Sequence, residues 1–458
     1  MNQKSLVLLA ATLAAAICYV LLASVPYPPA VCWTGAITLL CAILWITEAL
    51  PIPVTALIAI ALFPSVGVLT PAETGQAVGS PTVLLVLGGF ILSASMVSSG
   101  AHRRVALGMV NLIGGTSSRR IVFGFMCAAA FLSMWISNAA TSLMLLPVAL
   151  AIIERAEDPK LATPLLLGLA YASSIGGLGT PIGTPANLVF IENYAIATGE
   201  EISFTQWMRW GLPVALLLLP VCFIWITRGL RHRKRLELPA TGQWQKPEKR
   251  VLCVFAVTAL AWMTRAEPFG GWSGLVGLPD VTDTSIAIIA AISLFIVPDG
   301  HGGKLLDWES ASRIPWGILI LLGSGFAIAR AFSESGLSTI LGEGLSGLSG
   351  LPILLMIAGL CLVVTFMTEL TSNTATTTLL MPVLAAAAFA AGFEDPALMM
   401  LPAALTASCA FMLPTATTPN TVAFSTGRFP LRKMVSEGMV LNLLGVIVVT
   451  LLSYWMLR

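Results

Sequence analysis

The sequence predicts an all-α polytopic membrane protein with about eleven transmembrane helices, built as inverted repeats with two re-entrant helical hairpins and two broken helices. Three observations carry this prediction. Hydrophobic residues make up 57% of the 458 positions and charged residues only 10%, whereas soluble domains carry about 25% charged residues. Long apolar segments recur, and several reach the roughly 20 residues that cross a bilayer. Finally, motifs of the first half return in the second half in the same order.

Two Ser-Asn motifs reveal the duplication. Residues 133–148 read SMWISNAATSLMLLPV, and residues 368–383 read TELTSNTATTTLLMPV. Ser137-Asn138 therefore matches Ser372-Asn373 at an offset of 235 residues. If each copy crosses the membrane an odd number of times, the two copies lie in opposite orientations, which is the inverted-repeat plan of secondary transporters.

The hairpins follow from segments 121–153 and 352–393, which are apolar for too long to be single crossings. Ser, Asn and Thr interrupt each segment near its middle. Unpaired backbone in lipid costs several kcal/mol, so such a break must be shielded by protein or line a cavity. A hairpin that enters and leaves on one side fits both facts. The Gly- and Pro-rich stretches 176–187 and 412–420 likewise interrupt two further helices.

The predicted organisation has five parts. They are N-terminal scaffold helices (1–120), a first-repeat hairpin and broken helix (121–229), a cytoplasmic linker (230–250), second-repeat scaffold helices (251–350), and a second-repeat hairpin, broken helix and last helix (351–458). Basic residues are densest between Arg228 and Arg250. The positive-inside rule then predicts a cytoplasmic N-terminus and an external C-terminus.

The four backbone breaks predict the chemistry of a solute site near the membrane midplane. Free N–H groups at helix starts suit carboxylates, while carbonyl, hydroxyl and amide oxygens suit Na⁺. No Lys, Arg or His falls within the motifs. A fixed cation at the bilayer centre costs about 2.5–3.5 kcal/mol, whereas a mobile Na⁺ can leave with the solute. The pattern predicts cation-coupled anion transport across a lipid bilayer, and no nucleic-acid partner.

On these residues the chain resembles the divalent anion/sodium symporter family, the di- and tricarboxylate carriers of bacteria and animals. The resemblance covers essentially the whole chain and rests on Ser137-Asn138, Ser372-Asn373-Thr374, Gly183-Thr184-Pro185, Ala416-Thr417 and the early motif Trp45–Pro51. It implies a homodimer in the bacterial inner (plasma) membrane. It also implies Na⁺-coupled symport of C4-dicarboxylates (succinate, malate, fumarate) by a transport domain that slides against a scaffold in elevator fashion.

The resemblance further implies which residues bind each solute. The first sodium site would use Ser133, Ser137, Asn138 and Gly183. The second would use Thr368, Ser372, Asn373 and Ala416. Substrate carboxylates would lie on Asn138, Thr184, Pro185, Ser372, Asn373, Thr374, Thr417 and Thr418.

Two departures from the family pattern make the halves unequal. Ala139 stands where the family usually has Thr, and Thr418 stands where Pro is common. The carboxylate contacts are therefore expected to differ between the halves, which favours a substrate other than succinate or a weaker binding of succinate.

Several alternatives stay open at this point. The nearest is a carrier of the same fold for sulfate or citrate, or a dicarboxylate exchanger. Exchangers of this family replace sodium ligands with basic residues, and none is present here. An enzyme would need a nucleophile–base pair or metal ligands at a dry site, but the three His residues lie in polar connections and no Cys/His ligand spacing exists. A channel suits tips that close a site less well than alternating access does.

Charged residues inside apolar segments raise separate expectations. Glu369 is either functional or paired with Arg330, and its repeat counterpart is Met134. Glu48 and Arg330 are expected near span ends. Segment 101–115 is expected to form an interfacial helix.

Overall fold

The computed structural model describes residues 3–113, 117–156, 158, 160–230, 243–267, 270–345 and 352–458. Helices account for 77% of the described residues, which form no strand. Nine helices in this described part are long and apolar enough to cross a membrane. The all-α membrane fold is thus confirmed, while the count of eleven spans stays a prediction.

The first half contains eleven helices. They are α1 (Gln3–Ser24), α2 (Pro29–Thr47), α3 (Ile52–Ser65), α4 (Pro71–Val78), α5 (Pro81–Ser98), α6 (Ala101–Ile113), α7 (Ser118–Ser133), α8 (Asn138–Arg155), α9 (Ala162–Gly177), α10 (Pro185–Thr198) and α11 (Phe204–Ile226).

The second half also contains eleven helices. They are α12 (Lys246–Met263), α13 (Gly271–Leu275), α14 (Asp283–Ile296), α15 (Trp308–Ala311), α16 (Trp316–Ser335), α17 (Leu337–Leu345), α18 (Ile353–Leu370), α19 (Asn373–Ala390), α20 (Ala397–Ala407), α21 (Thr418–Ser425) and α22 (Leu431–Met456).

Helix boundaries repeat with the sequence motifs. Helices α18, α19 and α20 begin 235 residues after α7, α8 and α9, and α21 begins 233 residues after α10. Each Ser-Asn motif lies between two helices of a hairpin, α7–α8 and α18–α19. The helix breaks cover residues 178–184 and 408–417, so the second break begins earlier than the predicted 412. The orientation of the two copies in a membrane stays a prediction.

The predicted linker 230–250 needs a corrected boundary. Residues 231–242 lie outside the described residues, but α12 already begins at Lys246. The reason is local: Pro247 occupies the first turn, and the Glu248 carboxylate accepts a hydrogen bond from the Gln245 N–H at 2.7 Å, which caps the helix start.

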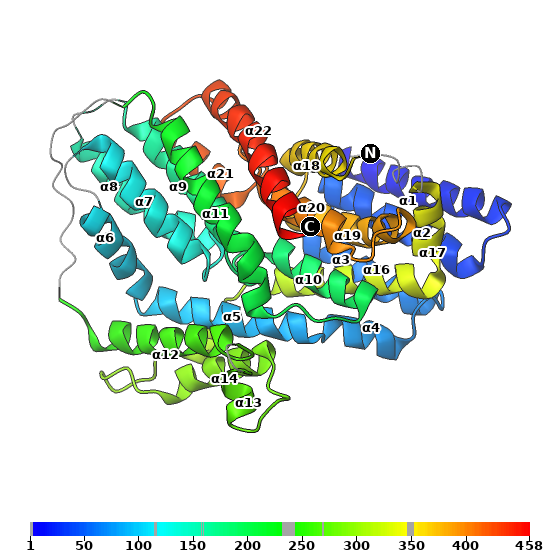
Figure 1. The fold of residues 1–458 in the computed structure, drawn as a ribbon, viewed down its shortest axis with the longest axis horizontal. Coiled ribbons are helices and arrows are strands. Elements are labelled where there is room, and N and C mark those ends of the chain that lie inside the picture. Colours follow the sequence, from blue (N-terminus) through cyan, green and yellow to red (C-terminus); the bar gives the residue numbers. More distant parts are fainter. Residues whose placement is uncertain are drawn as a thin grey trace.

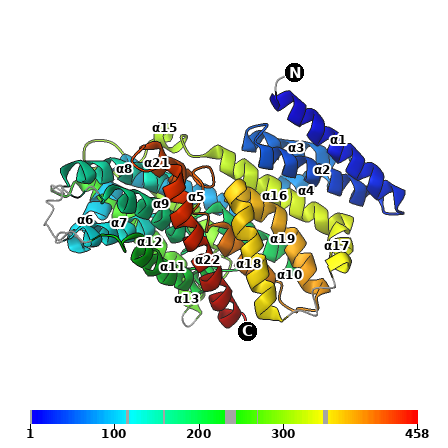
Figure 2. The ribbon, with the colours of Figure 1, turned by 90° about the horizontal axis from the view of Figure 1, so that it is seen from above.

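Two groups of helices lie at opposite ends of the molecule (Figures 1 and 2). Helices α6, α7, α8 and α9 lie at one end, and α1, α2 and α3 lie at the other. Helix α22 runs between them in both views. Within the first group, α6 forms the helix predicted for 101–115 as far as Ile113; its place relative to a membrane stays a prediction.

Candidate transport site

Both Ser-Asn motifs and both helix breaks line one cavity of about 440 Å³. All eight residues predicted to contact carboxylates line it: Asn138, Thr184, Pro185, Ser372, Asn373, Thr374, Thr417 and Thr418. Residues 235 positions apart in the sequence thus face the same space. The fold brings the predicted substrate residues together.

Four helices begin at this cavity. The first residues of α8, α10, α19 and α21 are Asn138, Pro185, Asn373 and Thr418, and all of them line it. The first N–H groups of a helix have no partner within the helix, and its start carries a partial positive charge. Four such starts around one cavity make a site for anions without a basic side chain.

The predicted sodium ligands form two layers. Six of them line the cavity: Ser137, Asn138, Gly183, Ser372, Asn373 and Ala416. Ser133 and Thr368 are fully buried behind it, one helix turn before the motifs. Each of these hydroxyls lies against the Asn side chain of its own hairpin.

Oxygen atoms gather around the Asn138 side chain. One terminal atom of its amide lies 2.6 Å from Ser133 Oγ, 3.1 Å from the Ser173 carbonyl oxygen and 3.2 Å from the Gly183 carbonyl oxygen. With the amide nitrogen in that place, its two hydrogens face three oxygen acceptors. With the amide oxygen there, four oxygens lie close together, and neutral oxygens are the donors that suit Na⁺.

The second half repeats this arrangement, except that the helix-end carbonyl oxygen lies next to the Thr hydroxyl instead of the Asn amide. Thr368 Oγ1 lies 2.8 Å from Asn373 Oδ1 and 2.8 Å from the Ala407 carbonyl oxygen at the end of α20. Hydroxyl, amide and helix-end carbonyl oxygens again meet beside the break. The two halves therefore offer similar neutral oxygen donors, one set per repeat.

Two buried asparagines stabilise the helix breaks by hydrogen bonds to backbone carbonyl oxygens. Asn187 Nδ2 donates to the carbonyl oxygens of Gly177 and Thr180, both at 2.8 Å. Asn420 Nδ2 donates to those of Ala410 and Leu413, both at 3.0 Å, which are the equivalent positions at an offset of 233. These bonds satisfy carbonyls that the interrupted helices leave free. The asparagines end the motifs PIGTPAN and PTATTPN, but the sequence alone did not indicate this role.

Glu369 does not pair with Arg330, so that alternative was wrong. Arg330 instead lies 3.0 Å from Gln76 Oε1 and 3.7 Å from the Glu73 carboxylate. The Glu369 carboxylate is 3% exposed and accepts hydrogen bonds from the backbone N–H groups of Met412 (2.8 Å) and Leu413 (2.9 Å).

Glu369 also accepts a hydrogen bond from Asn442 Nδ2 of α22 at 2.8 Å. All three partners are donors, so the carboxylate ties α18 and α22 to the second break. In the first half, Thr180 Oγ1 instead donates to the Met134 carbonyl oxygen. A buried carboxylate thus holds the second break, and a neutral hydroxyl holds the first.

Glu48 is a site residue that sequence reasoning missed. It follows the last turn of α2, as expected for a span end, but it also lines the cavity. Among the lining residues it is the one with a charged side chain. Its φ of 46° is the positive value that non-glycine residues rarely adopt. No periodic pattern marks such a position, because the contact depends on how α2 packs against the repeats.

The unequal pair also faces the cavity. Ala139 and Thr374 both line it, one on each hairpin. Only the second half therefore presents a hydroxyl at this position. Thr418 and Pro185 differ in the same way at the starts of α21 and α10.

Comparisons with known proteins now identify the family. A citrate transporter family model (CitMHS) matches residues 42–408. A sodium-dependent dicarboxylate transporter of Staphylococcus saprophyticus is 40% identical over 446 residues, which cover 92% of this chain and 85% of that protein. The chain belongs to the divalent anion/sodium symporter family. A sodium-dependent dicarboxylate transporter of Staphylococcus aureus is 38% identical over 460 residues, covering 94% of this chain and 88% of that protein.

Solved structures agree on the fold of this family member. The Alcanivorax borkumensis YdaH transporter has a TM-score of 0.58 at 15% identity and covers 86% of this chain and 88% of its own. Neisseria gonorrhoeae MtrF has a TM-score of 0.60 at 15% identity, with coverages of 87% and 83%. The chain is a multi-pass membrane transporter, not an enzyme.

Replacing Gly177 with Ala is expected to disrupt the first oxygen cluster. A Cβ at this position would lie 2.6 Å from Asn138 Oδ1, closer than real Cβ contacts allow. Asn138 must then move, and we expect solute uptake into proteoliposomes to fall about 10-fold or more, as for loss of a ligand-orienting contact. Gly108→Ala is the matched control, because a Cβ there meets nothing within 4 Å. Wild-type uptake by both variants would show that transport does not depend on the position of the Asn138 side chain.

Proposed function

We propose that this chain is a Na⁺-coupled symporter of C4-dicarboxylates such as succinate, malate and fumarate. One observation carries the proposal: four helix starts and two sets of neutral oxygen donors converge on one cavity that has no basic lining residue. Relatives that are 38–40% identical over most of the chain are named sodium-dependent dicarboxylate transporters, which supports the same class of solute.

Charge explains why the site would bind both a carboxylate and Na⁺. Helix starts attract the carboxylates, but they carry only partial positive charge. A dianion in a cavity whose one charged lining residue is Glu48 needs further positive charge. Na⁺ ions at the two oxygen clusters would supply it and would leave with the substrate. Binding of the anion therefore depends on sodium.

Two similar halves suit a substrate with an anionic group at each end. Each half contributes one Asn and two helix starts to the cavity. A C4-dicarboxylate can place one carboxylate on each half. The inequality of Ala139 and Thr374 would then set the preference among such acids. Because a citrate transporter family model matches the chain, citrate is the second candidate substrate. Sulfate transport and dicarboxylate exchange are further candidate functions.

Uptake into proteoliposomes tests the proposal. The purified chain would be given labelled succinate with an inward Na⁺ gradient, with an equal K⁺ gradient, and with unlabelled malate, citrate or sulfate in excess. We expect uptake only with Na⁺, and competition by malate above citrate and sulfate. Uptake that ignores sodium would refute symport, and stronger competition by citrate would move the proposal to a tricarboxylate carrier.

We further propose that movement occurs by an elevator mechanism. Helix α21 packs on α8 and α9, and α22 packs on α11, α18 and α20, so the hairpins and broken helices of both repeats form one group. Helices α12 and α14 pack on each other and on α5. These packing relations support a transport domain that slides against a scaffold.

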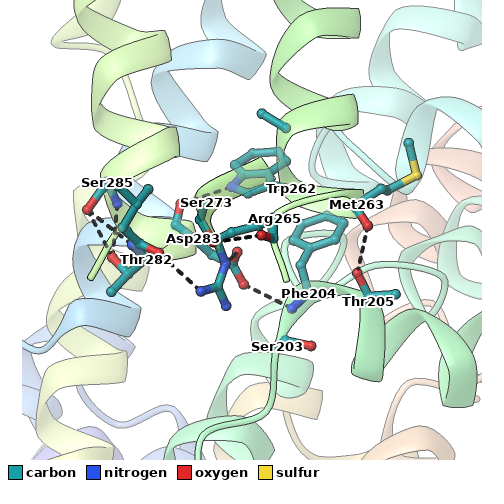
Figure 3. Close-up of polar contacts among 12 residues, drawn as sticks. Ser203, Phe204, Thr205, Trp262, Met263, Arg265, Ser273, Thr282, Asp283 and Ser285 are labelled. Carbon is teal, nitrogen blue, oxygen red and sulfur yellow. Dashed lines mark hydrogen bonds and ion pairs between the residues drawn. The ribbon is translucent and has the colours of Figure 1, made fainter. Parts of the chain in front are cut away.

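One boundary between these groups is a small polar junction (Figure 3). The Phe204 N–H at the start of α11 donates to Asp283 Oδ2 at 2.9 Å, and Arg265 Nε lies 2.6 Å from Asp283 Oδ1. Thr205 Oγ1 donates to the Met263 carbonyl oxygen at 3.2 Å. Since α11 belongs to one group and Asp283, Arg265 and Met263 to the other, these contacts must break if the groups slide.

Cross-linking this junction is expected to stop transport. In a background whose eight native cysteines are replaced, Thr205→Cys and Met263→Cys would be joined by a short thiol cross-linker. We expect uptake to be lost on cross-linking and restored by cleavage of the linker, with neither single-cysteine variant affected. Full uptake by the cross-linked protein would exclude sliding at this boundary.

We also propose that the chain forms a homodimer in the bacterial plasma membrane. Its N-terminus would lie inside the cell and its C-terminus outside. The nine apolar helices and the bacterial relatives support the membrane location. Light scattering of the detergent-purified protein should give the mass of two chains. A C-terminal alkaline phosphatase fusion, which is active only outside, should be active. A single-chain mass or an inactive fusion would contradict the respective part.

A further inference from the structure

A second cavity, which contains no residue of the Ser-Asn motifs, lies where three helices of the transport group begin or end. It has a volume of about 350 Å³ and is bounded by the first turn of α9, the residues after α11 and the first turns of α22. We call it the basic cleft, and define it by its charged lining residues Lys160, Arg228, Lys433 and Glu437.

Positive charge exceeds negative charge in the basic cleft. The buried Glu437 carboxylate lies 2.6 and 2.9 Å from the Arg228 guanidinium and 2.6 Å from Lys433 Nζ. One carboxylate is thus shared by two cations, whose side chains stay nearly half exposed. The Lys160 ammonium makes no ion pair within the described part of the chain. Among the described lining residues, three cations face one carboxylate, which gives the lining a net charge of +2.

Two acids of the described part lie near the cleft. Asp158 lies just before it and keeps its charge, because its carboxylate accepts hydrogen bonds from neutral donors, Ser118 Oγ at 2.9 Å and the Lys160 backbone N–H at 3.0 Å. Glu154 lies 3.7 Å from Arg428. Neither lines the cavity.

One helix start adds to the attraction for anions. Helix α9 begins at Ala162 without a side-chain cap, and Thr163 and Pro164 of its first turn line the cleft. Free N–H groups at helix starts favour phosphate groups. Helix α22 contributes Lys433, whose N–H already donates to the Pro430 carbonyl oxygen at 2.9 Å. The cleft therefore combines three cationic side chains, a hydroxyl and one helix start.

We propose that the basic cleft binds a phosphate group, carried by an anionic phospholipid headgroup. The cleft is formed at the ends of α11 and α22, two helices long and apolar enough to cross a membrane, so in a bilayer it would lie at headgroup level. Basic pockets between membrane helices are known to take such headgroups. A soluble phosphate ester offers the same chemistry, so the test separates the two sources. The inference does not depend on which anion the central cavity transports.

Lipid binding to the full chain tests this inference. Native mass spectra of the detergent-purified protein would count bound phosphatidylglycerol and, as the neutral-headgroup control, phosphatidylcholine. We expect selective retention of phosphatidylglycerol, and affinity about fivefold weaker for each lysine removed in Lys160→Gln and in Lys160→Gln with Lys433→Gln. Lys304→Gln with Arg313→Gln removes the same charge elsewhere and should leave retention unchanged.

The single variant Lys160→Gln keeps the test clear of folding defects, since Lys160 makes no ion pair with any described residue. Inorganic phosphate serves as the soluble competitor. We expect millimolar phosphate not to displace the lipid. Displacement at that concentration would show that the cleft binds a soluble phosphate ester and not a headgroup. Equal retention of both lipids by the wild-type protein would overturn the proposal. So would unchanged phosphatidylglycerol binding in the double-lysine variant.

Discussion

Replacing Asn138 with Ala is expected to abolish sodium-driven uptake. The Asn138 amide is the centre of the first oxygen cluster, with Ser133 Oγ, the Ser173 carbonyl and the Gly183 carbonyl within 3.2 Å. The same residue begins α8 and lines the central cavity. In the proposed function, its removal would take a donor from the cation and a contact from the carboxylate at once. We expect half-saturation by Na⁺ to rise about 10–100-fold, the usual effect of losing a metal-site contact.

A buried asparagine outside the cavity is the matched control. Asn193 is 2% exposed and donates to the Val189 carbonyl oxygen within its own helix at 2.7 Å. Asn193→Ala should therefore leave the sodium dependence unchanged. Wild-type sodium dependence in Asn138→Ala would show that the first Ser-Asn motif serves packing alone.

Glu369→Gln is the second change with a large expected effect. The carboxylate accepts from two backbone N–H groups of the second break and from Asn442. The Gln side chain has one oxygen, so its NH₂ group must face a donor that it cannot satisfy. A buried donor left without a partner costs about 1–3 kcal/mol. We expect a lower unfolding temperature and a lower apparent affinity for Na⁺, because the second break, which contains the predicted sodium ligand Ala416, is held less firmly.

Thermal unfolding in detergent and sodium titration of uptake measure these effects separately. Glu334→Gln removes a half-exposed carboxylate that lies 4.0 Å from Arg330, and should change neither quantity. If Glu369→Gln behaves like this control, Glu369 does not support the second break.

The site could be predicted from the sequence because it is duplicated. Each Ser-Asn motif and each Gly/Pro-rich stretch identifies a place where a helix must stop, and two copies at one offset imply that the stops meet. The cavity does contain all eight predicted carboxylate contacts. Their roles in binding stay predictions, as do the sodium ligands.

Features that depend on packing between distant segments could not be predicted. Glu48 reaches the cavity because of how α2 lies beside the repeats. Glu369 faces the 412–413 backbone instead of Arg330, and this contact joins helices whose spacing no single-helix pattern encodes. Asn187 and Asn420 were visible as the ends of two motifs, but only the folded break shows which carbonyls they bind.

Binding of labelled succinate to the purified chain, titrated with Na⁺ at constant ionic strength, tests the central claim most directly. We expect succinate to bind only when Na⁺ is present. Asn138→Ala and Asn373→Ala should each weaken this binding, and Asn193→Ala should not. Succinate binding that is equal in Na⁺ and in choline, or that survives in both motif variants, would contradict a sodium-dependent dicarboxylate site at the paired helix breaks.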